Sequence, residues 1–426
     1  MSSAYHILSK NPTKKILVID NLAAPGQAGT GRSAAMFRNT FSSRDNQVLA
    51  NSAIDFYLSA QRELGIDIGL ELVGYLWLMS NQQISANEKS IEKMKGNGVE
   101  LKTHTGEELR RSIPGISTKL DSSDPEIAAM ELENIDGAIF GVKCGKLEPD
   151  RLVNFYNDRF LAMGGQSRFN TRATKLILEP RKKLDIEGEP FVWQEKRIAG
   201  VQVEGRLNGD IYADTIILAG GAWNNFLLEP LGLDGHIKSK KRQIFRAKTS
   251  RNSELEKLLF TNGFNEYGVI PFTVLPKCGI YLKPVRAGEQ FWIGCDEEMN
   301  REYIDLPDYE PGKYSAELTY YQRNIYPVLT SYFLPFRDKA PSGMWAGLIA
   351  YNTMDFLPLI FQYENLIVAG GDSGSGIMKA DSLGRIVESL YSEGPESEAM
   401  LFGNVPYRVS KLGVKKRSVE QEEWVL

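Results

Sequence analysis

Three apolar segments of this sequence each give way to a turn whose residues could bind a ligand. The turns begin at Asp20, at Ala219-Gly220, and at the glycine-rich stretch 370–376. Glycine turns and helix N-termini present backbone N–H groups to anions such as phosphates, and an acid at a strand end can hydrogen-bond a ribose. Each turn taken singly could be a loop that binds no ligand, but three such turns together are not explained in this way. The sequence therefore predicts one extended cofactor that is contacted from several sides.

The first of these turns follows a helix and a strand. Residues 2–9 have the apolar spacing of a short helix, and residues 15–20 form an apolar strand. This order is typical of the second half of a β-α-β nucleotide-binding unit, in which a first strand and a G-x-G-x-x-G turn hold a pyrophosphate. Neither precedes the helix here. We expect that the true start codon lies upstream; the alternative is a chain that has lost part of its cofactor site.

The remaining elements follow from apolar periodicity and turn residues. A loop rich in Gly, Ala and Pro at 21–31 precedes a helix-like segment that runs through Leu58. Strands are predicted at 73–79 and 173–178, a strand meander at 190–217, and helices at 85–112, from 150 and from about 378 to 391. The stretches 279–284 and 289–294 indicate an antiparallel sheet within 238–340. Beyond Glu393 the sequence is polar, and we expect a tail that wraps the surface.

The composition narrows the class of protein. With 426 residues, 42% hydrophobic and 24% charged, the chain resembles a large folded enzyme. A net charge of -4 and dispersed basic residues argue against a nucleic-acid partner. No apolar run is long enough to span a membrane and no leader pattern opens the chain, so we expect a cytoplasmic location. Three distant cysteines and three histidines argue against a disulfide framework, a metal site and a Cys–His nucleophile pair.

Six motifs, in this order and spacing, carry a resemblance to a known family: 16–20 (ILVID), 29–35 (GTGRSAA), 147–152 (LEPDRL), 217–223 (ILAGGAW), 345–347 (WAG) with 355–360 (DFLPLI), and 368–385 (VAGG through GR). On these motifs the chain resembles the D-amino-acid oxidase superfamily of FAD-dependent oxidoreductases, in its sarcosine oxidase, glycine oxidase and dimethylglycine dehydrogenase-like branch. The resemblance implies an α/β fold, with a Rossmann-like FAD-binding domain that is incomplete at the N-terminus and an antiparallel-sheet substrate domain. The FAD-binding domain is expected to comprise residues 1–70, 141–225 and 341–395. The substrate domain is expected to comprise residues 71–140 and 226–340, and residues 396–426 a C-terminal tail.

The resemblance also implies which residues hold FAD. Asp20 binds the adenosine ribose, while the flavin and pyrophosphate lie by Gly31, Arg32 and Ser33. Backbone groups of Thr174 and Leu176 meet the adenine, and the cofactor is closed over by Ala219, Gly220 and Trp223. The pyrimidine side of the ring meets the turn that contains Gly371, Gly374, Gly376, Ile377 and Met378, where a helix N-terminus favours the charge of reduced flavin. Relatives that attach FAD covalently use a His in the segment matching 29–35, which has none here, so we expect non-covalent FAD.

For an amine substrate the site has to fix the carbon next to nitrogen and the substrate carboxylate, while the flavin accepts a hydride. Lys379 is the first candidate for the carboxylate, because relatives place a substrate-binding lysine within one position of it. Arg38, about one helical turn beyond the loop 29–35, is the second. Lys283 and Tyr281 are two residues apart on a predicted strand, so they share a face and could line one cavity. The structural alternative for each cation is a solvated side chain or an ion pair.

These residues lead to one function and two alternatives. We expect an FAD-dependent enzyme that oxidises the C–N bond of a secondary amine or amino acid by hydride transfer to flavin, giving an imine that hydrolyses in water. Oxidation of a 2-hydroxy acid or a glycerol phosphate, or a non-catalytic truncated scaffold, are the alternatives. The resemblance allows a homo-oligomer or an electron-accepting protein as partner. The aromatic residues Trp77, Trp292 and Trp345 are expected in the core rather than around a substrate.

Overall fold

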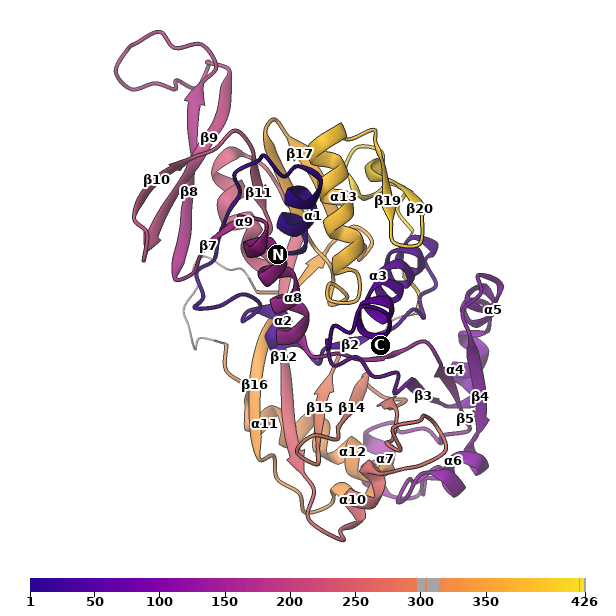
Figure 1. Cartoon of the computed structure of the whole chain (residues 1–426). Coiled ribbons are helices and arrows are strands. Elements are labelled where there is room, and N and C mark those ends of the chain that lie inside the picture. The colour runs from indigo at the N-terminus through magenta and orange to yellow at the C-terminus, as the bar shows by residue number, and fades with distance from the viewer. Residues whose placement is uncertain (297–302, 305–313, 421, 425–426) are drawn as a thin grey trace.

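The computed structural model describes residues 1–296, 303–304, 314–420 and 422–424. Figure 1 shows a large sheet with its helices in the lower half of the molecule and smaller sheets with the longest helices in the upper half. The longest helices are α3 (Arg44–Arg62), α8 (Pro149–Ala162) and α13 (Ala380–Glu393), and the N-terminal helix is α1 (Ser2–Lys10). The α/β class predicted from the sequence is confirmed.

The large sheet has eight strands in the order β16-β12-β15-β14-β13-β3-β5-β4. Their bounds are Gly343–Asn352, Ile237–Lys248, Gln290–Cys295, Ile280–Val285, Phe272–Val274, Tyr75–Met79, Gly137–Gly141 and Leu101–Thr105. All neighbours are antiparallel except β13 and β3. The expected antiparallel sheet is therefore mixed, because β3 and β13 are far apart in sequence and no hairpin joins them.

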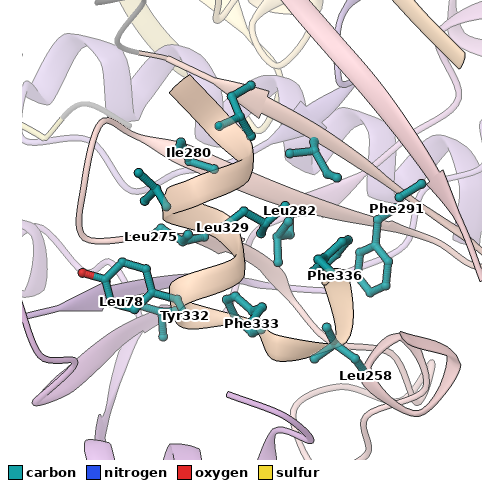
Figure 2. Packing of buried hydrophobic residues seen from close by; sticks show 14 of the residues in the cluster. Leu78, Leu258, Leu275, Ile280, Leu282, Phe291, Leu329, Tyr332, Phe333 and Phe336 are labelled. Atoms are coloured by element: carbon teal, nitrogen blue, oxygen red, sulfur yellow. The ribbon is translucent and has the colours of Figure 1, made fainter. Parts of the chain in front are cut away.

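One face of this sheet forms an apolar core with α12 (Tyr326–Tyr332). Figure 2 shows Leu329 beside Leu282 of β14, and Phe336, which follows α12, against Phe291 of β15. Each such fully buried side chain contributes about 1.5–3 kcal/mol of transfer free energy. Side chains alternate along a strand, so the intervening residues of β14 and β15 lie on the opposite face, toward the upper half of the molecule.

The upper half contains two small sheets with parallel strand pairs. β1 (Leu17–Ile19) pairs with β7 (Gln166–Arg168), and β11 (Ile216–Leu218) pairs with β18 (Leu366–Gly370), which has β17 (Leu359–Tyr363) on its other edge. Helix α1 packs against α8 and α13. The three turns identified in the sequence follow the carboxyl ends of β1, β11 and β18, where ligands bind in open α/β sheets.

Helix α3 is positioned by its cap and its buried face. The hydroxyl of Ser43 accepts from the Asn46 N–H, which satisfies one free N–H group of the first turn. Buried residues recur every three or four positions, at Leu49, Ala53 and Tyr57. The helix-like segment predicted through Leu58 is confirmed, and its first turn is held against the core.

Two sequence predictions change in detail. The meander is a three-stranded antiparallel sheet of β8 (Thr171–Pro180), β9 (Lys196–Gly205) and β10 (Gly209–Tyr212), which projects at the upper left of Figure 1, and β11 belongs to the sheet of β18 instead. Residues 85–112 were predicted as helices with short connections. They contain part of α4 (Asn81–Ala86), then α5 (Glu88–Gly96), strand β4 and α6 (Gly106–Ser112), because β4 completes the edge of the large sheet.

The remaining elements are short. The helices are α2 (Gly29–Arg32), α7 (Pro125–Ala129), α9 (Asn224–Leu228), α10 (Glu254–Leu259) and α11 (Leu318–Tyr320), with single turns η1 (Gly221–Trp223), η2 (Glu229–Leu231), η3 (Tyr321–Ile325), η4 (Leu334–Phe336) and η5 (Val409–Leu412). The strands are β2 (Met36–Phe37), β6 (Gly145–Lys146), β19 (Glu398–Leu401) and β20 (Val405–Arg408). The prediction of a polar surface tail beyond Glu393 is wrong, since β19 and β20 pair and Trp424 is 2% exposed within an apolar cluster.

Candidate active site

Asp20 lies directly after β1 and is partly buried. The N–H of Leu22 donates to its Oδ1 at 2.8 Å, and the N–H of Thr171, at the start of β8, donates to its backbone carbonyl at 2.9 Å. Burial raises the pKa of Asp20, and the hydrogen bond from Leu22 opposes that shift. A partly desolvated carboxylate at a strand end fits the hydroxyl groups of a ribose. β8 also carries Thr174 and Leu176, the residues predicted to meet the adenine.

The turn between β18 and α13 requires glycine at several positions. Gly371 and Gly374 have φ angles of +61° and +82°, in the left-handed region that glycine adopts without strain. A Cβ on Gly376 would lie 1.7 Å from Oδ2 of Asp372. The turn thus keeps its backbone free of side chains and leads directly to Lys379, the N-cap residue of α13.

A buried asparagine ties the ends of β11 and β18 together. The N–H of Gly220 donates to Oδ1 of Asn224 at 2.7 Å, and Nδ2 of Asn224 donates to the carbonyl of Ala369 at 3.0 Å. Ala219 and Gly220 are exposed beyond this link, and Trp223 is partly buried next to it. The sequence pattern identified the two strand ends, but it gave no signal for Asn224.

The loop before β2 contacts the edge strand of the large sheet. Nη1 of Arg32 donates to the carbonyl of Ala346 at 3.1 Å, and Nε1 of Trp345 donates to the carbonyl of Arg32 at 3.0 Å. An open hollow of about 480 Å³ lies at this junction, lined in part by Gly31, Arg32, Trp345 and Ala346. Ser33 closes the loop by donating to the Thr30 carbonyl at 2.8 Å. The predicted flavin loop therefore borders a hollow that reaches the large sheet.

These observations test whether the residues fit FAD. The acid after β1 and the glycine turn before α13, with two glycines in left-handed backbone, suit the ribose and the ring portions of the cofactor. Ile377 and Met378 continue the turn, with the Ile377 carbonyl accepting from the hydroxyl of Tyr57 at 2.9 Å and the Met378 side chain buried.

Lys379 is completely buried between α3 and the glycine turn. Its Nζ donates to Oδ1 of Asn46 and to Oγ of Ser375, each at 2.5 Å, and lies 4.8 Å from the centre of the Phe41 ring. Burial lowers the pKa of Lys379 to about 7, against the opposing charges of Glu422 and Asp372. The alternative that Lys379 is a solvated side chain is therefore excluded.

Arg38 also contacts the Phe41 ring. Its guanidinium carbon is 4.4 Å from the centre of that ring and 6.0 Å from that of Trp77, and Nη1 donates to the carbonyls of Thr40 at 2.6 Å and Trp424 at 3.1 Å. The expected helical offset from the loop 29–35 is wrong, because the chain between them forms β2 and is extended. Within the described ranges, no Asp or Glu lies within the 4.0 Å ion-pair distance of Arg38 or Lys379.

Lys283 and Tyr281 lie on the site-facing side of β14. Nζ of Lys283 donates to the carbonyl of Ala34 at 2.5 Å and sits 4.2 Å from the centre of the Trp292 ring. Burial and the nearby charge of Lys146 lower the pKa of Lys283 to about 7. The ring of Tyr281 stacks on Phe272 at 5.0 Å, and burial raises its pKa.

The segment from Ala34 to Phe41 connects three of the four predicted catalytic residues. Lys283 binds its first residue, Arg38 lies within it, and Lys379 contacts the Phe41 ring at its end. Trp292 touches both Lys283 and Trp345, which lines the hollow, so it is partly buried on the site face and not in the core as expected. Trp77, by contrast, lies within an apolar cluster, as predicted.

Sequence reasoning missed several polar partners of this site. Asn46 and Ser375 bond Lys379, and Glu422 and Trp424 reach the same place from the end of the chain. The position of Ser375 inside the glycine turn was a usable signal. Asn46 and Glu422 follow no motif, because only the packing of α3 against the tail brings them to Lys379.

Two negative findings bound the chemistry of the part of the chain that is described. None of its helices is both long and apolar enough to cross a membrane. Nor do its His, Cys, Asp and Glu side chains gather in threes in a way that could hold a metal ion. The site is thus built from cations, aromatic rings, one ribose-type acid and glycine turns.

Glycine turns at the carboxyl ends of parallel strands, facing a sheet that carries buried cations, define a nucleotide-cofactor enzyme with a separate substrate wall. A profile of the FAD dependent oxidoreductase family matches residues 1–390, and the chain belongs to that family. FAD is the cofactor of this family, and its members are oxidoreductases, as the sequence predicted.

Individual relatives agree with this assignment. The chain is 23% identical over 418 residues to FAD-dependent oxidoreductase domain-containing protein 1 of Xenopus laevis, covering 92% of this chain and 77% of that protein. Among solved structures it is similar to L-proline dehydrogenase from P. horikoshii, with a TM-score of 0.70 and 20% identity over 92% of this chain and 90% of that one. Glycine oxidase from Geobacillus kaustophilus gives 0.67 and 16% over the same shares. At these identities the two structures support the fold.

Proposed function

We propose that the protein oxidises the C–N bond of a secondary amine or an amino acid, and that Arg38 and Lys379 hold the carboxylate of the substrate. The observation that carries this proposal is a pair of buried cations whose hydrogen-bond partners are neutral oxygens. Burying a charge costs several kcal/mol unless an opposite charge compensates it. A substrate carboxylate supplies that charge, and the guanidinium offers it a planar pair of donors.

The aromatic side chains next to Arg38 give this site a low dielectric. Trp77 lies 5.2 Å from Tyr75 and Tyr75 lies 4.4 Å from Phe272, measured between ring centroids, and all three are buried. They exclude water from one side of the cations, which strengthens the attraction for a carboxylate and fixes its orientation. Bound FAD supplies the two-electron acceptor for the carbon next to nitrogen.

Lys283 occupies the sheet side of the same segment. Because its pKa is about 7, it can take up or release a proton near neutral pH. We assign it to the wall of the site and not to carboxylate binding, because the positive charge of Lys146 lowers its pKa further.

A substrate panel tests the proposal. The purified holoprotein is mixed without oxygen with L-proline, sarcosine, glycine, D-alanine, lactate and glycerol 3-phosphate, and the visible flavin absorbance is followed. We expect bleaching by one of the amines and not by the hydroxy compounds. Bleaching by lactate or glycerol phosphate alone would replace amine oxidation with the oxidation of an alcohol.

The mode of cofactor attachment has its own test. We propose that FAD is held without a covalent bond, because the segment 29–35 contains no histidine. Acid precipitation of the yellow protein should leave the flavin in the supernatant. Flavin that stays with the precipitated protein would contradict this part of the proposal.

A further inference from the structure

The last described residues of the chain are anchored beside the site. Arg417 forms a buried two-point ion pair with Asp355, from Nε and Nη2 at 2.6 Å each, and its Nη1 donates to the Pro358 carbonyl at 3.1 Å. This clamp fixes the chain to the turn before β17. From there it runs to Glu422 and Trp424, which are both buried. A loose surface tail would need no such anchor, so the tail has a defined place in the fold.

The carboxylate of Glu422 is held by neutral donors at the start of α3. Oε1 accepts from the N–H of Ser42 at 2.6 Å and from its hydroxyl at 2.7 Å, and Oε2 accepts from the Ser43 N–H at 3.2 Å and from Nδ2 of Asn46 at 3.0 Å. The N–H of Trp424 also donates to Oε1, at 3.1 Å. Both carboxylate oxygens of Glu422 thus accept hydrogen bonds from N–H and O–H groups.

Asn46 stands between this carboxylate and Lys379. Its Nδ2 donates to Glu422, so its Oδ1 points the other way and accepts from Nζ of Lys379 at 2.5 Å. A carboxylate accepts only and an ammonium donates only, so the two groups together allow one orientation of the amide. Glu422 therefore determines which atom of Asn46 the lysine meets.

The same stretch of chain also reaches the second cation. The carbonyl of Trp424 accepts from Nη1 of Arg38, and the Trp424 ring meets Trp77 edge-on, with centroids 5.3 Å apart. Both cations assigned to the substrate carboxylate are thus held, directly or through one side chain, by residues 422–424.

We propose that Glu422 is a positioning residue of the carboxylate site, acting on Lys379 through the amide of Asn46. The part of this inference that concerns substrate binding rests on the proposed function. The charged and titratable groups that face Lys379 are Glu422 from the tail, Asp372 from the glycine turn and Arg38 from the segment after β2. Of the two acids, Glu422 is the one that also bonds the amide.

Replacement of Glu422 by glutamine tests this role. In Glu422→Gln a new N–H₂ group faces donors, and the amide of Asn46 turns to accept from it, which brings Nδ2 against the ammonium of Lys379. We expect the Kd of acetate, measured by flavin difference spectra of the holoprotein, to rise about tenfold near neutral pH. The pH above which acetate binding weakens should fall by about one unit. Glu423→Gln is the matched control, since Glu423 is exposed and bonds Ser90.

A double variant separates positioning from simple support of the fold. Glu422→Gln with Asn46→Asp restores an acceptor for both the glutamine and Lys379, so the pH limit of acetate binding should return to the wild-type value or exceed it. Unchanged acetate affinity and pH limit in Glu422→Gln would overturn the proposal. So would a double variant whose pH limit of acetate binding is no higher than that of Glu422→Gln.

A measurement of thermal stability tests the link between Glu422 and Lys379 without relying on substrate binding. Glu422→Gln and Lys379→Met are combined in a double-mutant cycle of Tm, at about pH 6, where Lys379 is charged, and at about pH 9, where it is neutral. We expect the two changes to be non-additive at the lower pH and closer to additive at the higher one. Additivity at both would overturn the positioning role. If the wild-type protein binds no acetate while the cycle is non-additive, the proposed function fails and the positioning role stands.

Discussion

The two buried lysines of the site share a pKa of about 7 but are held in different ways. Lys379 starts a helix and donates to two side-chain oxygens, with two acids close enough to favour its charge. Lys283 lies in the middle of a strand and donates to a backbone carbonyl above an indole ring, with a further lysine near it.

This difference indicates different roles for Lys379 and Lys283. Nearby acids and side-chain acceptors retain an ammonium, so Lys379 suits the binding of an anion. Around Lys283 the like charge of Lys146 acts more strongly than either of the acids Glu148 and Glu71, which favours the neutral amine, so Lys283 suits proton exchange in the wall of the site. Similar pKa values therefore arise from different balances, and the surrounding groups identify the role better than the pKa does.

The sharpest test replaces each lysine by methionine. Because a charge-assisted hydrogen bond contributes about 1.5–3 kcal/mol, Lys379→Met should weaken acetate binding by about 100-fold, while flavin content stays at the wild-type level. Lys283→Met should change acetate affinity less than about threefold. Flavin titrations measure both. Equal losses in the two variants would break the comparison, and loss of flavin from Lys379→Met would make that residue a cofactor or folding residue.

The pH dependence of acetate binding distinguishes the two lysines next. Acetate keeps its charge above about pH 6, so changes there report the protein. The ammonium of Lys379 is lost as the pH rises through about 7, so affinity should be constant below that value and fall up to tenfold for each unit above it. The fall should persist in Lys283→Met and disappear in Lys379→Met. A fall that disappears only in Lys283→Met would exchange their roles.

A smaller effect is expected from the hydroxyl that bonds Lys379. Ser375→Ala removes one of its two acceptors without a charge, so the Kd of acetate should rise about threefold to tenfold. Trp292→Leu removes the ring under Lys283 and should leave this Kd unchanged. The same titrations, with flavin content as the control, decide between these outcomes, and an unchanged Kd in Ser375→Ala would contradict the bonding of Lys379.

Thermal stability should show the smallest difference. Below pH 7 the folded chain bears the cost of burying charged Lys283, and between pH 7 and the ordinary value of 10.5 it binds fewer protons than the unfolded chain, so stability rises with pH. Lys283→Met should therefore raise Tm by about 2 °C at neutral pH, with the gain shrinking toward pH 10. Lys379→Met should lower Tm, because the side chains of Asn46 and Ser375 each lose a buried hydrogen-bond donor. Calorimetry checks the signs, and a rise in both variants would remove the distinction.

The sequence by itself determined the local features of the site. The apolar runs before Asp20, Ala219 and Gly370 gave the strands, and the glycines gave the turns, because both depend on neighbouring residues and backbone sterics. The two-residue spacing of Tyr281 and Lys283 placed both on one face of β14, since side chains alternate along a strand. The family motifs added the FAD-dependent class, which the match over residues 1–390 supports.

Only the tertiary structure decided what surrounds the cations. Lys379 bonds Asn46 across 333 positions of sequence, and Asn46 bonds Glu422 across 376, so no periodicity or local motif records these pairs. The tail was predicted as polar surface from its local sequence, yet the clamp at Arg417 and the burial of Trp424 bring it to the site. A buried charge is tolerated only where polar groups hydrogen-bond it. Here those groups come from distant parts of the chain, and the packing of α3, the glycine turn and the tail brings them together.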